Sequence, residues 1–96
     1  MHYYCVAYDI SSNRLRLRVS KWCRQAGLER LQRSVFVGAA TPERLAELEG
    51  RIRPTLPRSD QFVVMPLDEK TYRQLIKNSR LPSAAVIDKK VVRWEF

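Results

Sequence analysis

Two neighbouring stretches decide the fold: His2-Tyr3-Tyr4-Cys5-Val6-Ala7-Tyr8-Asp9-Ile10 and Asn13-Arg14-Leu15-Arg16-Leu17-Arg18-Val19. The first is rich in tyrosine and valine and predicts a β-strand over residues 2–9. The second opens a helix, because Ser11-Ser12-Asn13 offers N-cap side chains and Gly27 a C-terminal stop. Its buried side is predicted from apolar spacing at Leu15, Val19, Trp22, Cys23 and Ala26. An apolar strand therefore ends in an acid, Asp9, and leads directly into an arginine-rich helix.

The following segments continue the alternation of strands and helices. Residues 28–39 predict one bent strand or two short strands, and the bent strand is favoured because no strong turn signal lies within them. Thr41-Pro42-Glu43 predicts the start of a second helix, which Pro54 and Pro57 end. The later elements are a strand at 62–65, a brief helix capped by Asp68, and a final strand within 86–96. This order predicts an α+β fold, a ferredoxin-like βαββαβ sandwich with an extra C-terminal strand.

The chain length predicts a single domain over residues 1–96 with a modest core. A homodimer would relieve the weakness of so small a core. The apolar end, Val91-Val92-Arg93-Trp94-Glu95-Phe96, is unsuited to water, so it completes either the chain's own sheet or the sheet of a partner. We favour the second arrangement, with residues 85–96 added to the partner subunit's sheet.

Composition excludes several classes of protein. Hydrophobic residues make up 45% of the chain, which excludes wholesale disorder, and the formal net charge of +8 is typical of nucleic-acid binders. No apolar run of spanning length, lipidation motif or signal segment is found, so we expect a cytoplasmic protein with no membrane partner. Cys5 and Cys23 are expected to be reduced core residues, and His2 has no neighbours at metal-ligand spacing.

The first helix carries most of the basic charge. Residues 10–33 contain seven Lys or Arg and a single acid, Glu29. A solvated helix face is the ordinary meaning of a charge run, but such a face normally mixes signs, as the second helix does. We therefore predict sequence-independent phosphate binding, without base stacking because no aromatic platform is interleaved with these arginines and Trp22 belongs to the predicted buried side. The predicted nucleic-acid-binding residues are Arg14, Arg16, Arg18, Lys21, Arg24 and Arg33.

Asp9 has two interpretations. An aspartate at the end of a strand commonly caps the next turn or pairs with an arginine. As a metal ligand it is isolated, because the other acids (Glu29, Asp60, Asp68 and Asp88) belong to separate elements. A two-fold dimer would bring two copies of Asp9 together, since a residue near the axis meets its own copy. Such a pair would share one Mg²⁺ or Mn²⁺ and activate a water molecule.

Three motifs in order resemble a known family: Tyr8-Asp9-Ile10, then Leu15-Arg16-x-Arg18-Val19, then Gly27-Leu28-Glu29-Arg30-Leu31-Gln32-x-Ser34-Val35-Phe36-x-Gly38. They are similar to the small CRISPR-associated endoribonucleases, the second of the Cas proteins (Cas2). The resemblance implies a ferredoxin-like homodimer in which each C-terminal strand joins the partner's sheet. It also implies metal-dependent cleavage of single-stranded RNA or double-stranded DNA in some members. In others, the dimer is a non-catalytic bridge between dimers of the Cas integrase and holds the DNA of a new spacer.

The resemblance also assigns roles to residues. It implies that Asp9 is the metal ligand, and that its active-site neighbours are Tyr8, Arg16, Arg18, Arg30 and Phe36. Many relatives have further acids in the loop after the aspartate, whereas here the loop reads Ser11-Ser12-Asn13. This departure removes negative charge that helps to recruit a metal, so it favours nucleic-acid binding over cleavage. A toxin-type ribonuclease on the same scaffold is a further alternative.

Overall fold

The computed structural model describes residues 2–79 of the chain. Its elements are β1 (Tyr3–Asp9), α1 (Asn13–Gln25), β2 (Glu29–Gln32), β3 (Val35–Ala39), α2 (Pro42–Ile52), a 3-10 helix (Arg53–Thr55), β4 (Gln61–Leu67) and α3 (Glu69–Lys77). The final strand predicted within residues 85–96, and its addition to a partner's sheet, lie outside the described residues.

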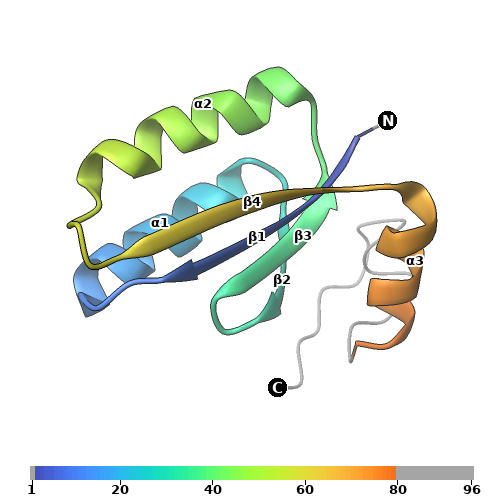
Figure 1. Ribbon diagram of the computed structural model, residues 1–96, viewed down its shortest axis with the longest axis horizontal. Helices are drawn as coiled ribbons and strands as arrows, with labels where there is room; N and C mark the ends of the chain where they lie inside the picture. Colours follow the sequence, from blue (N-terminus) through green and yellow to red (C-terminus); the bar gives the residue numbers. More distant parts are fainter. Residues whose placement is uncertain (1, 80–96) are drawn as a thin grey trace.

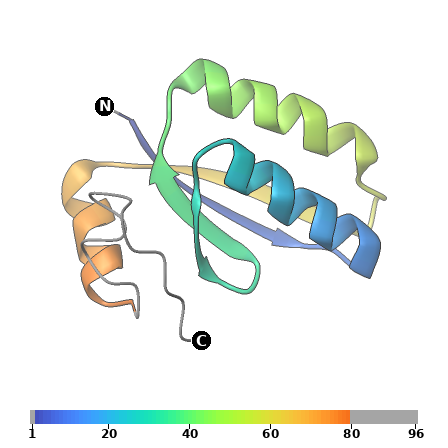
Figure 2. The same cartoon turned by 180° about the vertical axis from the view of Figure 1, so that it is seen from behind.

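The four strands of the described part form one antiparallel sheet in the order β2-β3-β1-β4. Figure 1 looks onto one face of this sheet, and Figure 2 shows α1 and α2 lying side by side across the other face. The strand order and the two helices on one face are those of a ferredoxin-like sandwich. The predicted α+β, ferredoxin-like fold is therefore confirmed.

Alternation along β1 divides the apolar interior into two clusters. Tyr4, Val6 and Tyr8 point toward α1 and α2 and belong to the larger cluster, together with buried side chains of both helices. Cys5 points the other way and packs with Tyr72 and Ile76 of α3. Helix α3 thus covers part of the second face, near the start of β1, where the rings of Tyr3 and Tyr72 stack with centroids 4.3 Å apart.

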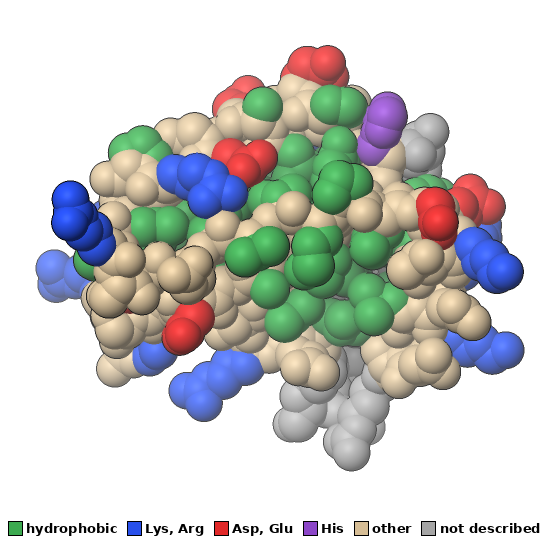
Figure 3. Space-filling model, viewed as in Figure 1, with side chains coloured by type: hydrophobic (Ala, Val, Ile, Leu, Met, Phe, Trp, Pro, Cys, Tyr) green, Lys and Arg blue, Asp and Glu red, His purple; other side chains and the backbone are tan. Residues whose placement is uncertain are grey.

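The second face is more exposed along β4 and at the end of β1. The opposed pairs Ala7 with Val63 and Asp9 with Gln61 share this face with Met65, and we call these five residues the open sheet face. Val63 is 45% exposed and Met65 39% exposed, which is unusual for apolar side chains in the middle of a strand. Figure 3 shows apolar side chains gathered over this side of the sheet.

Residues 29–39 form a hairpin, so the bent strand favoured by the local pattern is wrong. Strands β2 and β3 pair through a turn at Arg33 and Ser34, with a register shift between Arg30 and Gln32. The Tyr8 amide donates to the Ser34 carbonyl at 3.0 Å, and Arg30 Nη2 donates to the Arg33 carbonyl at 3.2 Å. Because a strand and a side chain satisfy the turn's carbonyl groups, the turn forms without glycine, proline or asparagine.

Side-chain caps begin all three α-helices where the sequence predicts them. Ser12 Oγ accepts from the Leu15 amide at 3.2 Å, Thr41 Oγ1 from the Arg44 amide at 3.1 Å, and Asp68 Oδ1 from the Thr71 amide at 2.7 Å. The bond from Thr71 lowers the pKa of Asp68. Helix α1 ends at Gln25 and is capped by Ala26. Gly27 follows with a φ of 93°, which glycine adopts at little cost.

Both cysteines are buried and free, as predicted for reduced core residues. Burial raises the pKa of Cys5, and it raises the pKa of Cys23 to about 12. Burial thus disfavours the thiolate, the nucleophilic form of cysteine, at neutral pH. These thiols therefore serve the packing of the two clusters.

Replacing each of two glycines by alanine should change the free energy of unfolding in opposite directions. A Cβ at Gly38 in β3 would lie 3.1 Å from Leu28 Cδ2, 3.2 Å from Leu28 Cα and 3.3 Å from the Gly27 carbonyl oxygen. Because two of these contacts are to backbone atoms, Gly38→Ala should lower the free energy of unfolding by about 1–3 kcal/mol. Denaturant titration of the purified protein measures this change.

Gly50 is the matched control within α2. A Cβ there meets no atom within 4 Å, and the residue is exposed. Gly50→Ala should therefore raise the free energy of unfolding by roughly 0.5–1 kcal/mol, because alanine favours the helical backbone. Equal stability of the two variants would contradict the close packing of the hairpin against Leu28.

Candidate nucleic-acid interface and metal site

Asp9 is the last residue of β1 and its side chain is exposed at the edge of the open sheet face. Gln61 lies opposite it on β4. Within residues 2–79, no group of three or more His, Cys, Asp or Glu side chains is placed to hold a metal ion. The described part of one chain therefore supplies no cluster of three ligands around Asp9, and metal binding by Asp9 stays a prediction.

Asp60 is a residue whose position the sequence does not reveal. It is only 8% exposed, and its Oδ1 accepts from the Ser11 amide at 3.3 Å and from Ser11 Oγ at 3.1 Å. These bonds fasten the loop that follows Asp9 to the start of β4. Because Asp60 is buried and bonded to Ser11, we assign it the role of positioning the loop. Its signal in the sequence, an acid before an apolar strand, is too common to identify it.

The structure brings four predicted site residues together beside α1. Tyr8, Arg16, Arg30 and Arg33 line a pocket of about 400 Å³, which we call the arginine pocket. Residues Asn13, Leu17 and Ser20 of α1 complete its lining. The side chains come from the strand β1, the helix α1 and the β2–β3 hairpin, so only the fold unites them.

Hydrogen bonds orient two of these arginines. Arg16 Nη1 donates to the Ile10 carbonyl at 2.9 Å, and Arg30 Nη2 donates to the Arg33 carbonyl at 3.2 Å. Arg30 Nε is buried and has no hydrogen-bond partner among residues 2–79. A buried guanidinium donor without an acceptor is costly, and an anion entering the pocket would satisfy it.

Tyr8 lines the arginine pocket and packs against Phe36 of the core. Their rings stack with centroids 6.2 Å apart, and the Arg30 guanidinium carbon lies 6.0 Å from the Phe36 centroid. Phe36 is fully buried, so the structure places it in the core beneath the pocket, where it supports Tyr8 and Arg30. Burial raises the pKa of Tyr8, and the charge of the Cys23 thiolate raises it further. The positive charges of Arg30 and Arg24, and a hydrogen bond with Ser20, lower this pKa in part.

The sheet separates Asp9 from the arginine pocket within one chain. Asp9 and Tyr8 are neighbours in sequence, but their side chains point to opposite faces of the sheet. Tyr8, Arg16, Arg30 and Phe36 therefore lie on the helical side, and Asp9 lies at the edge of the open sheet face. The family resemblance assigns these residues to one active site, but in a single chain they form two separate features, the Asp9 carboxylate and the arginine pocket.

The remaining predicted cations are exposed along α1. They are Arg14, Arg18, Lys21 and Arg24, which we call the basic face. Among the described residues, the salt bridges are Arg53–Glu49 and Arg73–Glu69, outside α1. Leu17 lies within this face and is 73% exposed. The basic face thus presents cations that no described carboxylate neutralises.

Comparisons with known proteins show which family this chain resembles. A family model described as CRISPR associated protein Cas2 matches residues 1–75. The CRISPR-associated endoribonuclease Cas2 2 of Pyrobaculum aerophilum is 35% identical over 83 residues, covering 85% of this chain and 91% of its own length. The crystal structure of Streptococcus pyogenes Cas2 at pH 6.5 is similar with a TM-score of 0.64 and 28% identity, covering 75% of this chain and 93% of that one.

A further relative joins two proteins in one chain. The CRISPR-associated endonuclease Cas1/endonuclease Cas2 fusion of Thermoproteus tenax is 34% identical over 70 residues. The match covers 72% of this chain and 26% of the fusion. The similar region is therefore one part of a longer polypeptide in that archaeon. Within the described residues, no helix has the length and apolar character needed to cross a membrane.

Proposed function

Because this chain belongs to the CRISPR-associated Cas2 family, we propose that it acts in CRISPR adaptation as a homodimer that binds nucleic acid alongside a Cas1 integrase. The fusion of Cas1 with Cas2 in Thermoproteus tenax supports that partner. The observation that carries nucleic-acid binding is the basic face of α1, which adjoins the arginine pocket and lacks acidic partners in the described part.

The two basic features suit a sugar-phosphate backbone. The cations of the basic face are spaced along one helix, so they would contact successive phosphates and release counterions. Arg30 Nε in the arginine pocket offers a donor that has no acceptor among residues 2–79. A phosphate at the mouth of this pocket would be attracted by the charges of Arg16, Arg30 and Arg33 while the backbone continues along α1.

The open sheet face supports the homodimer. Val63 and Met65 would be removed from water if a second copy covered the face they occupy. In a two-fold arrangement each residue near the axis meets its own copy, so Asp9 at the edge of this face would approach its counterpart. Dimerisation would thereby turn one carboxylate per chain into a facing pair.

The chemistry of Asp9 fits a divalent cation. Its carboxylate is exposed, and hard oxygen ligands suit Mg²⁺ or Mn²⁺, which proteins commonly hold through one or two carboxylates plus waters and phosphate. When bound, the ion would lower the pKa of a water molecule and neutralise charge at the scissile phosphate. The chain's own residues would hold the ion at Asp9 and fix the backbone through α1. We therefore propose a metal-dependent endonuclease acting on single-stranded RNA or double-stranded DNA.

A non-catalytic adaptor is the second candidate function. It is favoured by the separation of Asp9 from the arginine pocket, because nucleic acid held along α1 does not depend on the carboxylate. In this role the dimer would hold duplex DNA for the integrase without cutting it. The two functions share the binding surface and differ in whether Asp9 takes part.

Removing two charges from the basic face should weaken nucleic-acid binding and its salt dependence together. In Arg14→Gln/Arg18→Gln, each lost phosphate contact should reduce the slope of log affinity against log salt by about 0.9 on duplex DNA. Fluorescence anisotropy of a labelled duplex over a range of salt concentrations measures this slope. The loss should be similar for unrelated DNA sequences, since phosphate contacts do not read bases.

The matched control removes the same charge elsewhere. Arg58 and Lys70 are exposed and lie outside α1, so Arg58→Gln/Lys70→Gln should leave the slope close to that of the wild type. An unchanged slope in the α1 variant, or equal losses in both variants, would show that the basic face does not hold the backbone.

A further inference from the structure

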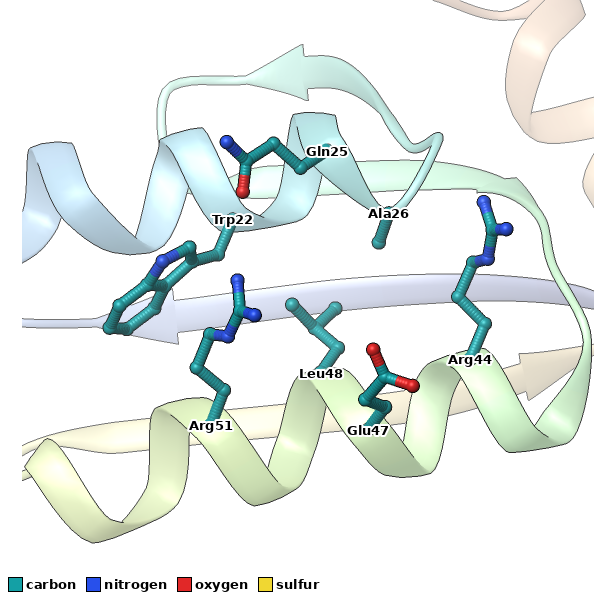
Figure 4. A pocket seen from close by; sticks show the side chains of 7 residues that line it. All are labelled: Trp22, Gln25, Ala26, Arg44, Glu47, Leu48 and Arg51. Carbon is teal, nitrogen blue, oxygen red and sulfur yellow. The ribbon is translucent and has the colours of Figure 1, made fainter.

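A second pocket lies between the two long helices, on the side of α1 away from the hairpin. It has a volume of about 320 Å³ and is lined by Trp22, Gln25 and Ala26 of α1 and by Arg44, Glu47, Leu48 and Arg51 of α2. No residue lines both this pocket and the arginine pocket. We call it the interhelical pocket (Figure 4).

The interhelical pocket combines an apolar floor with an aromatic wall. Leu48 and Ala26 are 5% and 9% exposed and form the floor between the helices. Trp22 is partly buried against the core, which holds its indole in place. The Arg51 guanidinium carbon lies 5.7 Å from the centroid of this ring, within the range of a cation–π contact. Figure 4 shows this pair at one end of the pocket and Arg44 at the other.

The polar groups of the pocket differ in sign. Arg44 and Arg51 are exposed, and neither forms a salt bridge with a carboxylate of residues 2–79. Glu47, between them on α2, and Gln25 on α1 add acceptors and amide donors. A ligand that fits must offer an anion for a guanidinium, a flat ring for the Trp22–Arg51 pair, and donors for Glu47.

We propose that the interhelical pocket binds one unpaired nucleotide of the nucleic acid held along α1. The base stacks on the Trp22–Arg51 pair, since guanidinium and aromatic planes both stack on bases. Arg44 takes the adjoining phosphate, and Glu47 accepts from an amino group of the base or a sugar hydroxyl. An acidic peptide has backbone donors for Glu47 but its Asp and Glu side chains offer no flat ring for the Trp22–Arg51 pair, and a bare phosphate has no ring either, so a nucleotide fits better.

The location of the pocket supports the same ligand. Trp22 directly follows Lys21 and lies one turn after Arg18, so a strand that leaves the basic face reaches the pocket without crossing another element. The sequence predicted no stacking because the apolar spacing assigns Trp22 to the buried side of α1 and leaves no aromatic platform among the exposed cations. The fold instead brings arginines of α2 beside the tryptophan of α1. This inference rests on the proposed nucleic-acid binding by α1.

The test uses the full chain with Trp94→Phe, which leaves Trp22 as the single tryptophan. It is titrated with a blunt DNA duplex and with the same duplex carrying single-stranded thymidine overhangs. The overhang should quench Trp22 fluorescence and tighten binding about tenfold, in line with the stacking of a single base. An overhang made of abasic sites should produce neither effect.

Charge variants locate the effect. Arg44→Gln and Arg51→Gln should each remove most of the tenfold advantage of the overhang while keeping the affinity for the blunt duplex. Arg58→Gln removes an equal charge from an exposed position outside the pocket and should keep the advantage. Anisotropy of the labelled duplexes with wild-type protein repeats the measurement without Trp94→Phe.

The outcomes separate the two proposals. Equal binding of blunt and overhanging duplexes with unchanged fluorescence would overturn the nucleotide site while nucleic-acid binding by α1 stands. Absence of binding to either duplex would overturn the proposed function itself. Quenching by polyglutamate that competes with the overhang would identify the pocket as a site for an acidic protein partner and would overturn the nucleotide assignment.

Discussion

Replacing Asp9 with alanine should abolish the metal-dependent cleavage that we propose, while the affinity for nucleic acid is kept. Asp9 is the exposed carboxylate at the edge of the open sheet face, and the cations of α1 and of the arginine pocket lie elsewhere. Loss of the ligand that positions the ion should lower the cleavage rate by about 100-fold or more. Removing a negative charge should leave phosphate binding unchanged or slightly tighter. Cleavage of labelled RNA and duplex DNA with Mg²⁺ or Mn²⁺, measured beside anisotropy, checks both parts.

Two further variants test whether the carboxylate itself is responsible. Asp9→Asn keeps the shape of the side chain and should be as inactive as Asp9→Ala. Gln61→Ala changes the residue opposite Asp9 on β4 without removing a charge, so it should keep most of the activity. Equal cleavage by wild type and Asp9→Ala would exclude Asp9 from the chemistry. If the wild-type protein cuts none of these substrates, the endonuclease hypothesis is wrong and the non-catalytic adaptor is the remaining candidate function.

Local patterns predicted most of the fold because local interactions create it. The caps at Ser12, Thr41 and Asp68 bond to amides three residues away, so their signals lie in short segments. The β2–β3 turn was missed for the opposite reason. Its Ser34 carbonyl accepts from the Tyr8 amide of another strand, and that contact leaves no local signature.

The site was predicted less completely than the fold. Side chains alternate between the two faces along β1, so Asp9 shares a face with Ala7, and Tyr8 shares the other face with Val6. The family resemblance assigns Asp9 and Tyr8 to one site, but the alternation separates them. The role of Asp60 depends on a bond to Ser11, 49 positions away in the chain. The interhelical pocket requires α2 to lie beside α1. Such features arise from tertiary contacts, which composition and periodicity do not encode.

A charge placed on the open sheet face should dissociate the homodimer that we propose. Val63 is 45% exposed in the single chain and lies opposite Ala7, near the middle of the face that we propose a second copy covers. Val63→Glu would bury a carboxylate among apolar side chains, which should weaken dimerisation by about 100-fold or more. Sedimentation equilibrium over a range of protein concentrations measures the dissociation constant.

The same substitution on another surface provides the control for that experiment. Leu17 is 73% exposed on α1, on the opposite side of the sheet, so Leu17→Glu should leave the dissociation constant of the dimer unchanged. Because each chain contributes one Asp9, metal-dependent cleavage by Val63→Glu should fall with the fraction of dimer and recover as the protein concentration rises. Recovery with concentration distinguishes dissociation from local damage, since a damaged site would stay inactive at every concentration. A monomeric Val63→Glu protein with full activity would show that one Asp9 is sufficient, and an undisturbed dimer would place the interface on a different surface.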